Sequence, residues 1–155
     1  MGEWLCELKM KVVELGHFVL YVTNLKRSVR FYNEVLGFPM IIKKDNLAVF
    51  SAGRTHHEML LIEIGGKPKE KTAPEPGLYH IGLKIGDSHE DVVKAYKELV
   101  KAGVVIIGTG DHTVTHSIYV LDPDGNELEL YADVSDKWKK DKSVILAPVK
   151  SLTLE

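Results

Sequence analysis

The chain carries one pattern of apolar and polar positions twice. Residues 14–38 and 77–104 each begin with an apolar run of strand type, pass through a polar turn and continue with apolar residues at helical spacing. Recurrence at i, i+3, i+4 and i+7 favours an amphipathic helix. Polar residues able to cap a helix precede each one, and a glycine follows it. The caps are Thr23-Asn24 and Asp87-Ser88, and the glycines are Gly37 and Gly103.

Three short strand-like runs follow each predicted helix. The Lys- and Pro-rich segment 65–77 separates the two halves, and Asp124-Gly125-Asn126 is typical of a hairpin turn between the last two strands. Both halves therefore have the order strand, helix, three strands. We predict an α+β fold of two βαβββ modules, residues 12–64 and 77–133. The tail, residues 134–155, lies outside the repeat and is a candidate edge cover, lid or subunit contact.

Composition narrows the classes of function. The chain has 155 residues, of which 45% are apolar and 27% charged, as in an ordinary globular domain. A net charge of −2 is too balanced for a nucleic-acid or anionic-membrane footprint. No apolar run is long enough to span a membrane, so we expect a cytoplasmic protein. The single cysteine, Cys6, permits neither an internal disulfide nor a thiolate zinc cage, which leaves seven histidines as candidate chemistry.

The ionisable residues also recur. His17 and His80 lie on the first strand of each half, and Glu63 and Glu129 lie on the last. One histidine on an apolar strand is usually structural, but recurrence in both halves favours a metal site if the two curved sheets face each other. Imidazole and carboxylate ligands suit Fe(II), Mn(II), Ni(II) or Zn(II), and two histidines with one carboxylate are typical of non-haem Fe(II) oxygenases. Glu129 lies between two leucines, where a buried carboxylate needs a cation as partner.

Four segments of the second half occur in a fixed order: Gly110-Asp111-His112, Ile118-Tyr119, Asp122-Pro123-Asp124-Gly125 and Glu129. This order is similar to the signature of extradiol ring dioxygenases in the vicinal oxygen chelate superfamily. Members of that superfamily pair βαβββ modules into a cup-shaped, partly open mixed sheet around one divalent metal. The pair His56-His57 in the first half is a second local match. The resemblance covers residues 12–133 as a single domain.

The resemblance implies an Fe(II)-dependent extradiol dioxygenase that cleaves a catechol-type aromatic with O2, in the catabolism of aromatic compounds. Catechol must lose a proton to bind a metal through both oxygens, so a histidine that titrates near neutral pH is useful as base and then as acid. Three protein ligands leave coordination positions open for both substrates. The implied metal ligands are His17, His80 and Glu129, and the implied catalytic residues are His57, His112 and Tyr119.

Two other functions stay open. Glu63 resembles, in its position, the second carboxylate ligand of glyoxalase I, a lyase that uses two histidines and two glutamates; Glu63 is therefore a candidate fourth ligand. The third hypothesis is a metal-free, antibiotic-binding protein of the same fold, although such a protein has no need for His17, His80 and Glu129 together.

The assembly and the remaining histidines are less constrained. Modules of this superfamily close within one subunit or across a dimer, and we expect a homodimer. His56 and His116 are candidates for either the site or a hairpin surface. His89, in the polar start of a helix, is expected to be solvated.

Overall fold

The predicted order of elements occurs twice in the computed structural model, which describes residues 11–68, 70 and 74–154. The first half contains β1 (Phe18–Val22), α1 (Leu25–Val29), a π-helical stretch (Arg30–Val35), β2 (Met40–Lys44), β3 (Leu47–Phe50) and β4 (Met59–Glu63). The second half contains β5 (His80–Gly86), α2 (His89–Lys101), β6 (Ile106–Asp111), β7 (Thr115–Leu121) and β8 (Glu127–Asp133).

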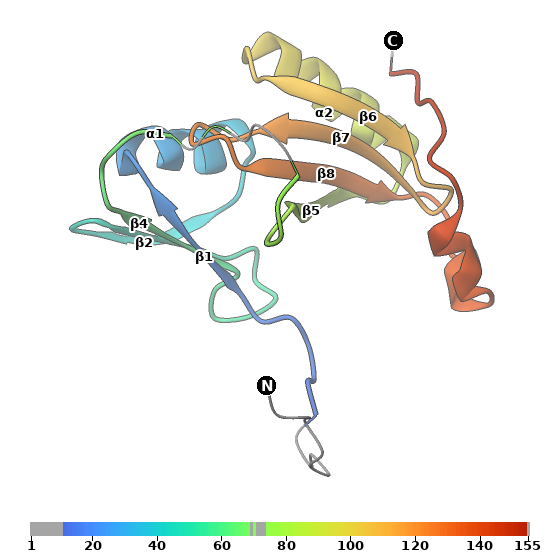
Figure 1. Cartoon of the computed structure of the whole chain (residues 1–155), viewed down its shortest axis with the longest axis horizontal. Helices are drawn as coiled ribbons and strands as arrows, with labels where there is room; N and C mark the ends of the chain where they lie inside the picture. Colours follow the sequence, from blue (N-terminus) through green and yellow to red (C-terminus); the bar gives the residue numbers. More distant parts are fainter. Residues whose placement is uncertain (1–10, 69, 71–73, 155) are drawn as a thin grey trace.

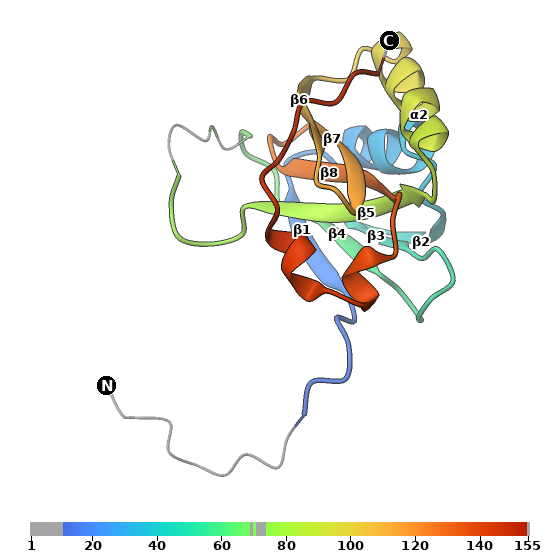
Figure 2. The ribbon, with the colours of Figure 1, turned by 90° about the vertical axis from the view of Figure 1, so that its right-hand side faces the viewer.

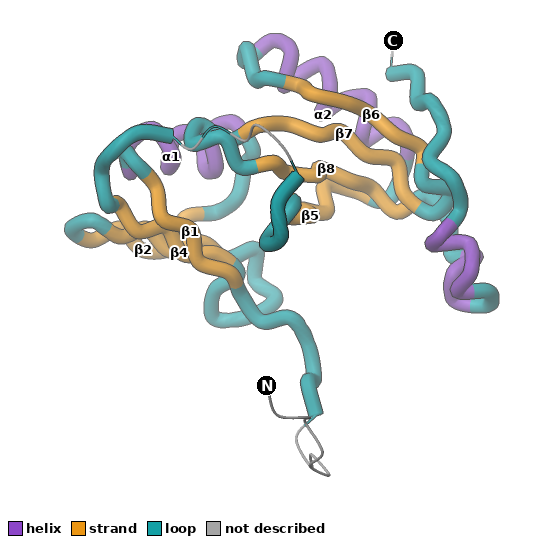
Figure 3. Tube along the Cα trace, viewed as in Figure 1, coloured by secondary structure: helices purple, strands orange, loops and turns teal. Residues whose placement is uncertain are grey.

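Each half forms its own four-stranded sheet, in the orders β1-β4-β3-β2 and β5-β8-β7-β6. The first and last strands of each half pair in parallel and the other pairs are antiparallel, so both sheets are mixed. Figure 3 shows the strands of the two halves as two separate groups. Helices α1 and α2 lie on the same side of the molecule, each over its own sheet (Figure 1). The predicted α+β fold of two βαβββ units is confirmed.

The predicted capping residues and glycines are found at the ends of the helices, but the first helix ends in a π-helical stretch. The side chains of Asn24 and Ser88 accept hydrogen bonds from the backbone N–H groups of Arg27 and Asp91. The glycines that follow the helices have positive φ angles, 68° at Gly37 and 70° at Gly103, a conformation that is costly for other residues. The first helix is not regular to its end, because the N–H of Leu36 bonds five residues back, to Phe31.

Alternation along the strands gives each sheet an apolar face under its helix and a second face without a helix. The buried strand residues are Leu20, Val22, Ala48, Phe50, Met59 and Leu61 in the first half and Ile118, Val120, Leu128, Leu130 and Ala132 in the second. Burying one Leu-sized side chain is worth about 1.5–3 kcal/mol. The strand residues that alternate with these, among them Ser117, Tyr119 and Glu129, are therefore directed to the second face of the sheet.

An acidic turn fastens the second half onto the first. The hydroxyl of Tyr32 donates to Asp122 at 2.8 Å, and Thr23 Oγ1 donates to Asp124 at 2.5 Å. Arg27 pairs with the same Asp124 carboxylate at 2.9 Å. Asp122 and Asp124 belong to the Asp-Pro-Asp-Gly segment of the dioxygenase-like motif, and in this fold they join the two halves.

The tail covers one sheet edge. After two short 3-10 helices, Lys137–Lys139 and Lys142–Leu146, the chain returns to β6, where the backbones of Asp111 and Lys150 exchange two hydrogen bonds. Leu154 is buried in the core. Figure 2 shows the tail running upward beside β6 to the C-terminus. No helix in the described part of the chain has the length and apolar character needed to cross a membrane.

Candidate metal centre and active site

The second sheet brings four of the predicted site residues into one chain of contacts. His80 Nε2 lies 3.2 Å from Glu129 Oε2. The other oxygen of Glu129 accepts hydrogen bonds from Tyr119 Oη at 3.3 Å and from Ser117 Oγ at 2.6 Å. His112 Nε2 is 2.7 Å from the same Tyr119 Oη. Two predicted ligands and two predicted catalytic residues therefore meet on the face without a helix.

Strand register explains why these side chains meet. Glu129 on β8 is directly opposite Tyr119 on β7 and Gly82 on β5, and Tyr119 is opposite Gly108 on β6. Residues in one such row point to the same face of a sheet. A Cβ on Gly82 would lie 3.4 Å from the Tyr131 ring and 3.9 Å from Glu129 Oε2, so the glycine leaves space beside the carboxylate.

The His80–Glu129 pair fits a divalent cation. Ligand atoms about 2.0–2.2 Å from a shared ion stand roughly 3 Å apart, close to the separation seen here. Among the described residues, His80 Nδ1 is one of the buried polar atoms without a hydrogen-bond partner; Glu127 Oε1 is 3.9 Å away. A carboxylate oxygen that faces an imidazole nitrogen at this separation suits a shared cation.

Tyr119 is held in its protonated form. Burial raises the pKa of its phenol, and the charge of Glu129 and the hydrogen bond to it raise this pKa further. Because the phenol keeps its proton, it donates a hydrogen bond to Glu129, while its oxygen also contacts His112 Nε2. Ser117, which sequence reasoning did not assign to the site, is a second donor to Glu129. The two-residue spacing from Tyr119 on one strand is the signal that identifies it.

His17 belongs to a separate group of imidazoles. Its ring centroid is 4.2 Å from that of His57 and 6.2 Å from that of His56. Nδ1 atoms of His56 and His57 are 2.5 Å apart. Reduced hydration, and then the neighbouring His17 and His56, lower the pKa of His57. Within residues 11–68, 70 and 74–154, no three His, Cys, Asp or Glu side chains lie close enough to hold one ion.

Glu63 does not lie with the predicted ligands. It shares a strand face with Met59 and Leu61, which are buried in the core, and its carboxylate accepts a hydrogen bond from the backbone N–H of Leu25 at the start of α1. The candidate fourth ligand therefore lies on the core face of β4, apart from His80 and Glu129. In the second half, Glu129 pairs with Gly82, two residues after His80. In the first half, Leu60 pairs with Val19, two residues after His17, so Leu60 occupies the position equivalent to Glu129.

His89 is half-buried, contrary to the expectation of a solvated side chain. Its Nδ1 lies 2.9 Å from Nδ1 of His116, and His116 Nε2 lies 3.7 Å from Asp111. His116 is opposite Ala132, on the face that α2 covers, so this pair lies outside the Glu129 face. The contact ties the start of α2 to β7.

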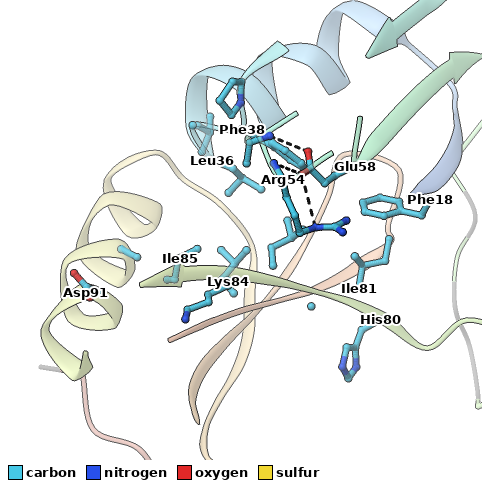
Figure 4. Close-up of a pocket in the computed structure, with 18 of the residues that line it drawn as sticks. Phe18, Leu36, Phe38, Arg54, Glu58, His80, Ile81, Lys84, Ile85 and Asp91 are labelled. Atoms are coloured by element: carbon cyan, nitrogen blue, oxygen red, sulfur yellow. Dashed lines mark hydrogen bonds and ion pairs between the residues drawn. The ribbon is translucent and has the colours of Figure 1, made fainter. Parts of the chain in front are cut away.

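A cavity of about 960 Å³ opens between the two halves, on the helix side of β5. Phe18, Ile81 and Ile85 line it, and two of the proposed ligands, His17 and His80, also border it. In Figure 4 the imidazole of His80 points to the other side of β5 from Ile81. Arg54 and Glu58, which pair within this region, organise the loop before β4. The cavity therefore borders the proposed ligands of both halves, with most of its apolar lining on the helix side of β5.

Comparison with known proteins agrees with the fold. Residues 14–130 match the Glyoxalase/Bleomycin resistance protein/Dioxygenase superfamily. The chain is 35% identical over 132 residues to a catechol-2,3-dioxygenase of Bacillus subtilis, covering 83% of this chain but only 45% of that relative.

This chain covers most of the length of two further similar proteins. The chain is 31% identical to the virulence protein STM3117 of Salmonella typhimurium over 128 residues, 79% of this chain and 86% of the relative. The crystal structure of a glyoxalase/dioxygenase from Nostoc punctiforme has the same fold, with a TM-score of 0.64 and 18% identity over 79% of this chain and 92% of that one. The chain belongs to the Glyoxalase/Bleomycin resistance protein/Dioxygenase superfamily.

Proposed function

We propose that the chain is a metal-dependent extradiol dioxygenase that opens the ring of a catechol-type aromatic with O2. The observation that carries this proposal is the continuous contact from His80 through Glu129 and Tyr119 to His112. The similarity to a catechol-2,3-dioxygenase supports it, although this chain spans less than half of that relative. Both atoms of O2 enter the ring-opened product, so the reaction needs no other oxidant or reductant.

His80 and Glu129, together with His17, would hold Fe(II), which supplies the one-electron chemistry that allows O2 to react with the ring. Ser117 and Tyr119 donate to one oxygen of Glu129 and so fix the orientation of the carboxylate. His112, in contact with the Tyr119 hydroxyl, is placed to accept a proton from the diol and to return it.

The proposed ligand set has three members, not four. Glu63 is engaged by Leu25 on the core face, and Leu60 occupies the first-half position equivalent to Glu129. A set of two histidines and one carboxylate leaves positions for a bidentate diol and for O2. This observation favours the dioxygenase over a glyoxalase-like lyase with a second glutamate ligand.

We further propose that two copies of the chain complete the site. His17 precedes β1, and by alternation it shares a face with Val19 and Tyr21. These two side chains are 45% and 68% exposed, although both are apolar or aromatic. The first sheet thus has an uncovered face that bears His17, and the second sheet has a face that bears His80 and Glu129. In a two-fold dimer, the first face of one copy can meet the second face of the other and complete the ligand set.

The test is anaerobic loading with Fe(II), followed by addition of catechols and O2. Oxygen uptake with formation of a yellow ring-cleavage product is the expected result. Absence of uptake with every catechol, together with conversion of a hemithioacetal by the Ni(II)- or Zn(II)-loaded protein, would establish the lyase instead. Glu63→Gln is the matched control: the dioxygenase keeps its iron and its turnover, whereas a two-glutamate lyase loses activity.

A further inference from the structure

The C-terminal tail is attached beside the proposed site at several points. Asp111 and Lys150 exchange backbone hydrogen bonds of 3.0 and 2.9 Å, and Thr109 Oγ1 donates to the carbonyl of Leu152. Leu154 is buried in the core. The superfamily match ends at residue 130, so this segment lies beyond the part of the chain that the family describes.

One tail side chain lies directly over the sheet next to His112. A Cβ on Gly110 would come within 2.9 Å of Val149 Cγ1 and 3.2 Å of His112 Nε2. The side chains of Val149 and His112 therefore lie over the same glycine. Gly110 on β6 is directly opposite Ser117 on β7. On the same face of the sheet, the next pair along β7 is Tyr119 with Glu129. Glycine at this position is what allows the tail to approach the sheet so closely.

The tail lies on the side of the second sheet that carries Glu129. In Figures 1 and 2 the two short tail helices and α2 are on opposite sides of that sheet. Val149 is 58% exposed despite its contact with the sheet, and Ile145 and Leu146 are also exposed. Around Glu129 this face carries the hydroxyls of Ser117 and Tyr119 and the imidazoles of His80 and His112. The tail thus supplies apolar surface at the edge of a polar site, where an aromatic ring needs it.

We propose that the tail forms the apolar wall of the substrate site and that Val149 determines which ring substituents fit beside His112. That the substrates are ring diols rests on the proposed function. That the tail forms a wall beside His112 is independent of it. A valine at this point admits a small substituent on the ring and excludes a bulky one. Val149 acts through size and touches no proton or metal.

The experiment measures anaerobic binding of catechol, 3-methylcatechol and 3-phenylcatechol to the Fe(II)-loaded full chain. Val149→Ala is expected to tighten binding of 3-phenylcatechol relative to catechol, and Val149→Phe to weaken binding of both substituted diols, each by about tenfold. Val105→Phe is the matched control, because Val105 is also 58% exposed but precedes β6 at its other end. Iron content and the circular dichroism spectrum verify that each variant is folded and loaded.

The outcomes separate this proposal from the proposed function. If catechol binds but the Kd ratios of the substituted catechols to catechol are unchanged in both Val149 variants, the proposed wall is overturned. Binding of catechol in that case still supports the dioxygenase. If no diol binds, the dioxygenase proposal fails, and the same ratios are measured with hemithioacetals of increasing size on the Ni(II)-loaded protein. A size dependence that Val149 controls then supports the wall alone. Binding of neither ligand class overturns both proposals.

Discussion

The hydroxyl of Tyr32 donates to Asp122 at 2.8 Å and thereby joins the helix of the first half to the last hairpin of the second. Both groups are buried, and Asp122 also accepts from the backbone N–H groups of Asp124 and Asn126. The same carboxylate therefore shapes the hairpin turn and fastens it. The relative placement of the two halves depends on this contact and on the neighbouring Arg27–Asp124 ion pair.

Tyr32→Phe is expected to destabilise the chain by about 1–3 kcal/mol, because it removes a donor from a buried carboxylate while keeping the ring. Urea unfolding followed by circular dichroism measures the change. Tyr21→Phe is the control, since Tyr21 is largely exposed. Equal stability of the two variants would show that the Tyr32–Asp122 hydrogen bond contributes nothing to the junction.

Metal content tests the proposed ligands without any assay of turnover. His80→Ala and Glu129→Gln are each expected to lose bound iron, because each removes one of two ligand atoms that lie 3.2 Å apart. Glu63→Gln should retain it, since that carboxylate caps the start of α1. Elemental analysis after dialysis gives the answer. Retention of stoichiometric iron by both His80→Ala and Glu129→Gln would remove the site.

Tyr119→Phe is expected to keep iron but to lower turnover by about 100-fold, because it removes the hydroxyl that contacts both His112 and Glu129. Steady-state oxygen uptake across a range of pH separates this role from a structural one. A role in orienting groups at the site changes kcat and its pH profile together. Turnover identical to the native chain would show that the hydroxyl has no part in the reaction.

Mixing two inactive variants tests completion of the site between copies. His17→Ala and Glu129→Ala are each expected to be inactive, but a mixed dimer has one site in which all three ligands are native. Refolding the two variants together should therefore restore oxygen uptake that neither has alone. A site closed within one chain gives no restoration, because every chain then carries a defective site.

The His89–His116 contact predicts a loss of stability in mild acid. Burial lowers the pKa of His116 below its ordinary 6.5; the Asp111 carboxylate opposes this, and His89 adds to it. Folding thus favours the neutral imidazole, so the contribution of His116 is complete above pH 6.5 and is lost as the pH falls through the folded-state value. Thermal unfolding between pH 8 and 5 should show a smaller decline in His116→Gln. An unchanged decline would exclude this residue as the cause.

The sequence by itself determined the features that depend on neighbouring residues. Asn24, Ser88, Gly37 and Gly103 set the ends of the helices, because capping and positive φ act within a few residues. Alternation within β7 and β8 placed Tyr119 and Glu129 on one face. The repeated order of elements followed from these local signals.

Only the tertiary structure decided the relations between segments far apart in the chain. The resemblance to glyoxalase I made Glu63 a candidate fourth ligand, whereas the pairing of β4 with β1 places its carboxylate against the start of α1. The motif turn around Asp122 and Asp124 joins the halves, and the tail brings Val149 to His112, through contacts that no local pattern encodes. Long-range packing decides such contacts, because they depend on how whole sheets and helices fit together.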